Sequence, residues 1–193
     1  TSDAGTEQGH GQGEESGLVT YPAPRYDPVN VCQPGTAEGI WSELQAGTSS
    51  VVFYMGHASV NGLWVSGDGT QILFGGYPFG TPEPNTPDAC YLENLSSGAL
   101  SRCALVVFGG CLTGVVDCGG RSLPGSAIGK GAATAVGFTG SPSAYVTYFG
   151  AFGESLMKWG HYVEVANVAG KQAVFDAYGQ YHGTDTLVIF GKT

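Results

Sequence analysis

The sequence predicts an α/β domain in which a mainly parallel central sheet is covered by helices on both faces. Three short apolar runs rich in β-branched residues, VVFYM (51–55), ALVVF (104–108) and ATAVGF (133–138), lack the polar alternation of half-exposed strands. This pattern is typical of strands buried on both sides. Aromatic and aliphatic residues then recur near helical spacing between 145 and 159. Strands that alternate with helices favour a parallel sheet between two helical layers.

The composition fits one domain with a substantial core, because 42% of the 193 residues are hydrophobic. The formal net charge is -9 at pH 7, and such an excess of acid repels nucleic acid and anionic lipid. No apolar run reaches the roughly 20 residues that cross a bilayer. We therefore expect neither nucleic acid nor a membrane as a principal partner.

The chain divides into three predicted parts. Residues 1–17 are acidic and Gly-rich with little to bury, which predicts a flexible tail. Residues 18–49 are punctuated by proline and predict an extended lead-in over the domain surface, with a short helix at 36–45. Residues 50–193 carry the strand and helix signals of the main domain. Because the chain begins at Thr1, we expect a mature product or a fragment excised from a larger precursor.

The elements of the main domain follow in order from the strand that ends at Gly56. An Asp-Gly pair within SGDGT (66–70) predicts a hairpin turn, and the Pro- and Gly-rich stretch at 75–97 is long enough to predict a surface loop. The other expected elements are hairpin strands at 63–65 and 71–74, helical turns at 94–100, a helix starting within 126–131, helices at 145–159 and 163–178, and a closing strand at 187–190.

Five cysteines are an odd number, which two disulfides and one free thiol would explain. Cys32, Cys90, Cys103 and Cys118 can pair in three ways, leaving Cys111 free between glycines and a following loop. The alternative is that all five are reduced thiols packed as small hydrophobic residues. The first interpretation favours an oxidising compartment and hence a secreted protein.

Two reactive residue types stand directly after predicted central strands. His57 follows VVFYMG and Cys111 follows ALVVFGG, with Cys111 placed 54 positions after His57. In open α/β sheets, functional groups gather at the carboxyl edge of the strands, so we expect these side chains to face each other across neighbouring loops. A thiol and an imidazole supply the nucleophile and the proton donor that acyl transfer needs. The order, His roughly 50 residues before Cys, is that of caspases rather than of papain-like peptidases.

The segments VVFYMGHASVNGLW and ALVVFGGCLTG resemble the His and Cys motifs of the caspase-like, gingipain-like superfamily of cysteine peptidases. The resemblance extends more weakly through GAATAVGFTGS and FGAFGESLM, and it implies a caspase-like three-layer sandwich. It makes Cys111 the nucleophile and His57 the acid-base partner, with the backbone N–H groups of Ala58 and Cys111 as the oxyanion hole.

The same resemblance places the segment after the third buried strand beside the substrate, where it would pair with the substrate backbone as an added strand. The candidate substrate-binding residues are Thr139, Gly140 and Ser141. Asp117 is the acid nearest to Cys111 in the sequence, and an ordinary loop role is the expected one for it.

Two positions depart from the pattern of the family. Ala58 stands where the family has glycine after the histidine, so a Gly-only conformation there would impair the oxyanion hole. Gly109 stands where legumain-like and clostripain-like relatives carry a carboxylate that reads the substrate side chain, so specificity is expected to come from other residues. Gly109 and Gly110 are expected to let the substrate backbone approach closely and to permit a tight turn, with positive φ, that exposes the sulfur.

The sequence therefore predicts a cysteine endopeptidase that acts on protein or peptide substrates, with no cofactor and no metal. Two alternatives remain open: a catalytically inactive binding module of a larger secreted protein, and a self-processing or acyl-transfer domain that uses the same dyad. A disulfide between Cys111 and Cys118 would favour the inactive module or act as a redox latch. His161 and His182 lie at polar junctions where capping is commoner than metal ligation.

Overall fold

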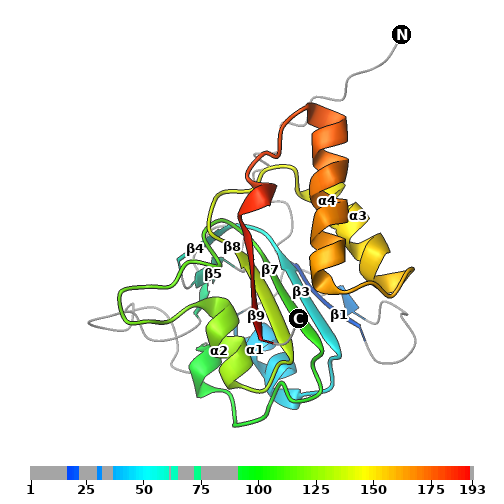
Figure 1. Ribbon diagram of the computed structural model, residues 1–193. Helices are drawn as coiled ribbons and strands as arrows, with labels where there is room; N and C mark the ends of the chain where they lie inside the picture. The colour runs from blue at the N-terminus through cyan, green and yellow to red at the C-terminus, as the bar shows by residue number, and fades with distance from the viewer. Residues whose placement is uncertain are drawn as a thin grey trace.

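The computed structural model describes residues 17–21, 30–31, 37–60, 62–64, 72–74 and 91–191. Within them lie a six-stranded sheet with the order β2-β1-β3-β7-β8-β9 and a small sheet with the order β4-β5-β6 (Figure 1). The strands are β1 Gly17–Tyr21, β2 Asn30–Val31, β3 Val51–Met55, β4 Ala58–Ser59, β5 Gly62–Trp64, β6 Ile72–Phe74, β7 Leu105–Gly109, β8 Thr134–Phe138 and β9 Leu187–Gly191. The helices are α1 Ala37–Ala46, η2 Leu92–Asn94, α2 Leu123–Gly129, α3 Tyr145–Met157, α4 Val163–Tyr178 and η3 Thr184–Thr186, of which η2 and η3 are 3₁₀ turns.

The main sheet is mixed, with a parallel centre and antiparallel edges. Strands β3, β7 and β8 run parallel to one another. On one side β1 pairs antiparallel with β3 and β2 pairs antiparallel with β1, and on the other side β9 pairs antiparallel with β8. The α/β class is confirmed, and the parallel centre gives neighbouring strands a common carboxyl edge.

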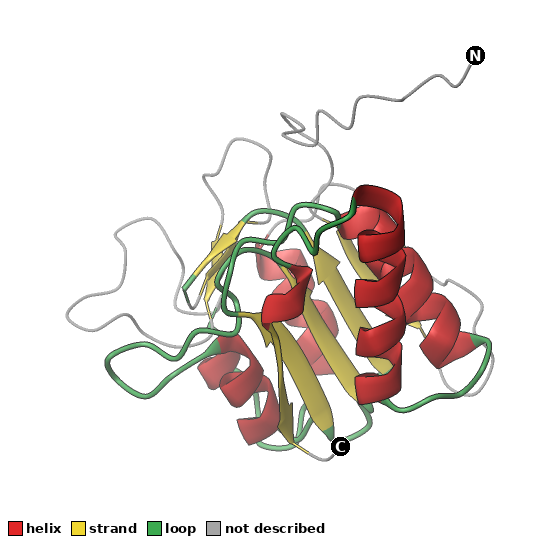
Figure 2. Ribbon diagram, turned by 45° about the horizontal axis from the view of Figure 1, so that its top comes forward, coloured by secondary structure: helices red, strands yellow, loops and turns green. Residues whose placement is uncertain are grey.

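Helices cover both faces of the sheet, as Figure 2 shows. Alternate side chains of β3 and β7 point to opposite faces, so Val52 and Val106 join one core while Phe53 and Val107 join the other. The first core also contains buried residues of α1 and α2, and the second contains buried residues of α3 and α4. This period-two alternation packs both faces of the same strands, which explains why the sequence runs are continuously apolar.

Three predicted elements differ from the structure. The stretch 94–100 is not a helix, because the 3₁₀ turn η2 ends at Asn94 and residues 97–100 form turns. Helix α2 begins earlier than expected because the side chain of Ser122 accepts a hydrogen bond from Gly125 N, which caps the helix before Pro124. Residues 18–49 were expected to begin as an extended segment over the domain surface. Instead, their first residues belong to β1, which forms a five-residue ladder with β3.

Several predictions fall outside the described residues and are not tested by the structure. They concern the acidic tail up to residue 16, the first residue of the helix expected at 36–45, the turn at 66–70, most of the loop at 75–97, and two of the cysteines, Cys32 and Cys90. The hairpin strands on either side of the turn, β5 and β6, are present and antiparallel.

Replacing Gly150 by alanine is expected to stabilise the protein. Gly150 lies inside α3, and a Cβ added there meets no atom within 4 Å. A helix-interior alanine is favoured over glycine by about 0.5–1 kcal/mol, because glycine loses more backbone entropy. Urea denaturation measures the gain. Gly170→Ala in α4 is the matched control, since its Cβ would meet the Tyr148 ring at 2.7 Å, and it should lose stability instead.

Candidate active site

The loops that carry His57 and Cys111 lie side by side at the carboxyl edge of two adjacent parallel strands. Met55 at the end of β3 is in register with Gly109 at the end of β7. The pairing continues one residue further, because Gly56 N donates a hydrogen bond to Gly109 O at 3.1 Å. The structure therefore brings together the two segments in which the sequence placed the dyad.

Two glycines allow the strand ends to approach this closely. A Cβ on Gly110 would lie 2.5 Å from the Ala58 Cβ and 2.9 Å from Gly56 O, and a Cβ on Gly109 would lie 2.7 Å from Tyr54 O. Neither glycine has a positive φ. The prediction of a positive φ at these glycines is wrong, and their lack of a Cβ lets the loop that carries His57 pack against the loop that carries Cys111.

The left-handed residue of the loop that carries Cys111 is Leu112, with φ 60°. A non-glycine residue in this region is strained, and such strain gathers at functional sites when the surrounding structure holds it in place. Leu112 N donates to Gly140 O at 2.9 Å, and Gly114 N donates to Phe138 O at 2.8 Å. These two bonds tie the loop after β7 to the segment that follows β8.

A buried hydroxyl holds the same loop from within. Thr113 Oγ1 accepts a hydrogen bond from Phe138 N at 3.1 Å and donates to Phe108 O at 2.7 Å or to Gly110 O at 3.0 Å. Thr113 is fully buried. The position of Cys111 is thus set by hydrogen bonds on both sides of it.

The histidine loop is supported by Tyr54 from β3. The buried Tyr54 hydroxyl lies between the carbonyl oxygens of His57 and Trp64 and donates to one or the other. Trp64 N in turn donates to His57 O at 2.9 Å. Trp64 belongs to β5, so the small sheet and β3 together fix the backbone at His57.

The side chains of the dyad are accessible but do not hydrogen-bond each other in this structure. The His57 ring is exposed and lies beside the Trp64 ring, with 5.9 Å between centroids. Cys111 is half-buried, and its Sγ lies 3.9 Å from Tyr145 Oη. Catalytic hydrogen bonds are often loose in unliganded enzymes and tighten when substrate binds.

Among the described residues, neither predicted oxyanion donor, Ala58 N or Cys111 N, donates a hydrogen bond to a backbone oxygen. In the hairpin of β4 and β5, Ala58 opposes Leu63, while the ladder bond runs from Trp64 N to His57 O. This register makes Ala58 and Leu63 a non-hydrogen-bonded pair, so the Ala58 N–H points away from the ladder. Cys111 N donates to no backbone oxygen of the described residues.

Ala58 does not adopt a Gly-only conformation. The non-glycine residues with positive φ in the described part of the chain are Leu112 and His182. Ala58, at the position where the motif resemblance would place a glycine, therefore has a backbone conformation that any residue can adopt.

The predicted substrate segment is held by the loop that precedes β9. Thr139 N donates to Thr186 O and Gly140 N donates to Thr186 Oγ1, while Gly140 O accepts from Leu112 N. These groups are already bonded and are not free to pair with a substrate strand. Ser141 is exposed at the end of the segment, and its role stays a prediction.

The remaining polar residues that the sequence singled out have structural contacts. Asp117 Oδ1 accepts from Gly119 N and Arg121 N, each at 2.8 Å, and so closes its own turn. His161 Nδ1 lies 3.0 Å from Ser155 Oγ at the end of α3. His182 Nδ1 lies 3.4 Å from Ser143 Oγ in the loop before β9.

No cluster of three or more potential metal-ligating side chains occurs in the described ranges. In the same ranges, none of the helices combines the length and the apolar character needed to span a membrane.

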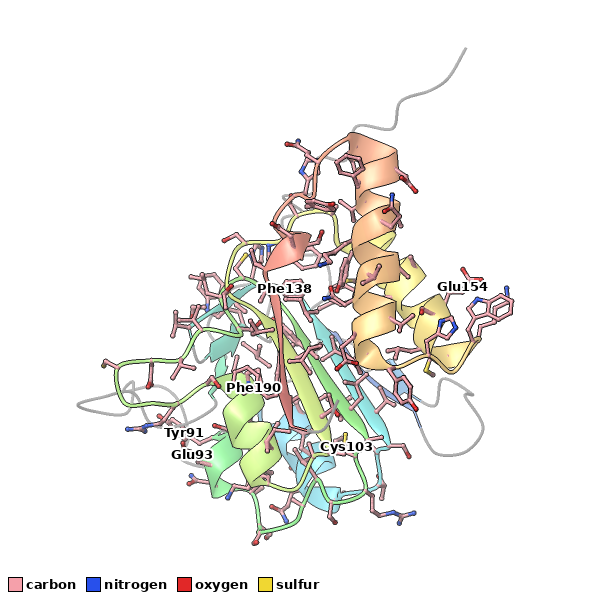
Figure 3. The ribbon with its side chains drawn as sticks, viewed as in Figure 1. Tyr91, Glu93, Cys103, Phe138, Glu154 and Phe190 are labelled. Carbon is pink, nitrogen blue, oxygen red and sulfur yellow. The ribbon has the colours of Figure 1, made fainter. Side chains whose placement is uncertain are left out.

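Cys103, Cys111 and Cys118 are free thiols. The structure thus differs from the expected pairing of four cysteines into two disulfides, since two of the four are unpaired, and Cys111 is not bonded to Cys118. Cys103 lies before β7, at the end of the sheet opposite to Phe138 and hence away from the candidate site (Figure 3). Burial raises the pKa of its thiol to about 11.

The three thiols are expected to differ sharply in reactivity. At pH 8, iodoacetamide should alkylate the exposed Cys118 and the half-buried Cys111 but spare Cys103, because a buried thiol with a raised pKa offers almost no thiolate. Peptide mass spectrometry after timed quenching measures each site. Equal alkylation after unfolding in guanidinium is the control, and rapid native labelling of Cys103 would contradict its burial.

Three residues that support the candidate site were not predicted from the sequence. Tyr54 was assigned to a buried strand, Tyr145 to core-facing helical packing, and Thr113 to no role. The three side chains share a hydroxyl group within a mainly apolar segment. This was the available signal, because a buried hydroxyl needs a hydrogen-bond partner. The sequence alone did not say which partners they would meet.

A scan against protein-family models and a search of curated proteins found no match to this chain.

Proposed function

We propose that the chain is a cysteine endopeptidase of caspase-like type, with Cys111 as nucleophile and His57 as its acid-base partner. The observation that carries the proposal is the convergence of the two loops at the carboxyl edge of β3 and β7, joined by the hydrogen bond from Gly56 N to Gly109 O. An α/β sandwich whose histidine and cysteine follow neighbouring parallel strands is the arrangement that the motif resemblance implies.

In the proposed reaction His57 takes the Sγ proton of Cys111, and the sulfur forms a bond to the carbonyl carbon of the scissile peptide. The carbonyl π electrons move onto oxygen, where the amides of Ala58 and Cys111 are available to donate. When the oxyanion collapses, the C–N bond breaks and the leaving amine takes the proton from His57. Water then attacks the thioester and releases the acid and the free thiol.

The backbone supports this assignment in two ways. Ala58 has no strained conformation and an N–H outside the hairpin ladder. The strain in the nucleophile loop lies at Leu112, directly after the cysteine, and neighbouring hydrogen bonds hold it. Preorganised donors of this kind act on the transition state without a cost of reorganisation during the reaction.

The test is covalent labelling with a small library of acylated peptidyl chloromethyl ketones, followed by peptide mapping. We expect sequence-selective modification of Cys111 in the wild type and none at this site in His57→Ala, because the histidine is needed to generate the nucleophile. Cleavage of a peptide library, read by mass spectrometry, then separates hydrolysis from acyl transfer to added amines. Modification that ignores the peptide sequence and is unchanged in His57→Ala would instead indicate an inactive module.

A further inference from the structure

The hydroxyl of Tyr145 lies at the candidate nucleophile although the ring belongs to the core. Tyr145 is the first residue of α3, and its Oη is 3.9 Å from Cys111 Sγ, which is within hydrogen-bonding range for sulfur. Cys111 is the partner that the structure gives this hydroxyl within the described residues. A thiol is a weak hydrogen-bond acceptor, whereas a thiolate is a strong one.

The ring of Tyr145 is held by aromatic packing. It stacks on Phe149, with 6.2 Å between centroids and an interplanar angle of 6°. Phe149 lies directly against the end of β7, because a Cβ on Gly109 would come within 2.8 Å of its Cε2 atom, and it also meets Phe53 edge-on at 4.7 Å. The hydroxyl is therefore aimed at the sulfur by the same residues that build the core.

The protonation state fixes the direction of the contact. When Cys111 is a neutral thiol, either atom can donate. When Cys111 is a thiolate it has no proton, so Tyr145 must donate. Burial in the first place, and then the neighbouring Cys111, raise the pKa of the Tyr145 phenol above its ordinary value, so the phenol keeps its proton and can donate it.

We propose that Tyr145 is a third catalytic residue, whose hydroxyl donates a hydrogen bond to the Cys111 thiolate and favours its formation. This inference rests on the proposed function, in which Cys111 is the nucleophile. Its role complements that of His57, whose exposed ring lies beside Trp64 in this structure and is not bonded to the sulfur. Tyr145 holds the sulfur from the α3 side, which leaves the imidazole free to exchange protons with substrate.

The titratable groups on the elements of the candidate site include Tyr145 on α3, His57 on the loop after β3, and Tyr54 on β3, whose hydroxyl contacts the His57 carbonyl oxygen. The carboxylate of Asp117 is bonded within its own turn. Tyr145→Phe removes one phenol oxygen and leaves these other groups in the chain.

The experiment follows the rate of Cys111 alkylation by iodoacetamide between pH 5 and pH 10, resolved by peptide mass spectrometry. Tyr145→Phe keeps the stacked ring and removes the hydroxyl. We expect the midpoint of the Cys111 profile to rise by about one pH unit, which is roughly tenfold less thiolate on the acid side of the curve. The control is Tyr148→Phe, on the same helix as Tyr145. It removes a hydroxyl that donates to Asn167 of α4, and it should leave the midpoint of the Cys111 profile unchanged.

Two further readouts keep the result unambiguous. The exposed Cys118 reports on the reagent and should show one profile in all variants. Replacing the Tyr145 ring by 3-fluorotyrosine makes the phenol a stronger donor without altering the packing, so the Cys111 midpoint should fall. A Cys111 midpoint that moves in neither direction overturns the assignment.

The alkylation profile does not depend on peptide hydrolysis, so the two proposals fail separately. A shifted midpoint in a protein that cleaves no peptide would retain Tyr145 as the donor and remove the peptidase. Peptide cleavage with an unshifted midpoint and unchanged kcat/KM in Tyr145→Phe would retain the peptidase and remove Tyr145.

Discussion

Replacing Cys111 by alanine is expected to lower peptide hydrolysis by on the order of 10³-fold or more, because no acyl-enzyme can form without the sulfur. His57→Ala should lose roughly 10²- to 10⁴-fold, the usual contribution of a general acid-base group. The double variant should be no worse than Cys111→Ala, since both residues serve one covalent route. Initial rates on a substrate taken from the library cleavage measure all three.

The controls for these variants are other residues of the same types. Cys118→Ala changes an exposed thiol, and His161→Ala changes an exposed imidazole at the end of α3, distant in the chain from either loop of the site. Both should retain wild-type rates. Losses in Cys111→Ala and His57→Ala that simply multiply in the double variant would contradict a shared route, because independent residues give additive free energies.

The fold class followed from the sequence because the central strands are buried on both faces. Val52 and Phe53 are neighbours in the chain yet join different cores, so their strand must be apolar throughout. The sequence does not show in the same way whether a strand runs parallel or antiparallel to its neighbour. The run at β9 is as apolar as the parallel strands, and its antiparallel pairing with β8 depends on the route of the chain through the loop before it.

Strand β1 escaped the prediction for a different reason. The prolines that follow it suggested a surface segment, but β1 lies between β2 and β3 in the sheet, and prolines beyond the end of a strand remove none of its ladder hydrogen bonds. Its ladder with β3, from Gly17 opposite Met55 to Tyr21 opposite Val51, is a long-range contact that no local pattern contains.

The placement of the two candidate loops was predictable because each follows a buried strand. His57 and Cys111 each follow a buried strand, and the structure places the two loops together. The support of these loops was not predictable, because it depends on which atoms meet in three dimensions. Thr113 reaches Phe138 N across the sheet edge, and Tyr145 reaches Cys111 over 34 residues of sequence.

The structural role of two glycines was likewise not predictable from the local sequence. The sequence suggested that Gly109 and Gly110 supply positive φ, which is a local property, whereas the structure uses them for close approach. Close approach depends on Ala58, Gly56 and Phe149, and their proximity is a consequence of the fold.

Replacing Gly110 by alanine is therefore expected to damage the site more than its single methyl group suggests. The new Cβ would lie 2.5 Å from the Ala58 Cβ and 2.9 Å from Gly56 O, and the second contact is with backbone that cannot rotate away. Overpacking of this kind costs about 1–3 kcal/mol. Because the strain separates the two loops, we expect kcat/KM to fall by about 10²-fold, the effect of a misplacement of about 1 Å.

The matched control is Gly129→Ala at the end of α2, where an added Cβ meets nothing within 4 Å and φ is not positive. It should retain both stability and activity.

The contact between Gly110 and Ala58 allows a rescue test. Gly110→Ala combined with Ala58→Gly removes the Cβ that the new methyl group would meet. Partial recovery of kcat/KM in the double variant would show that contact between the loops, rather than lost flexibility at residue 110, accounts for the defect. The remaining clash with Gly56 O should keep the recovery incomplete. An active Gly110→Ala enzyme with wild-type stability would contradict the close packing of these loops.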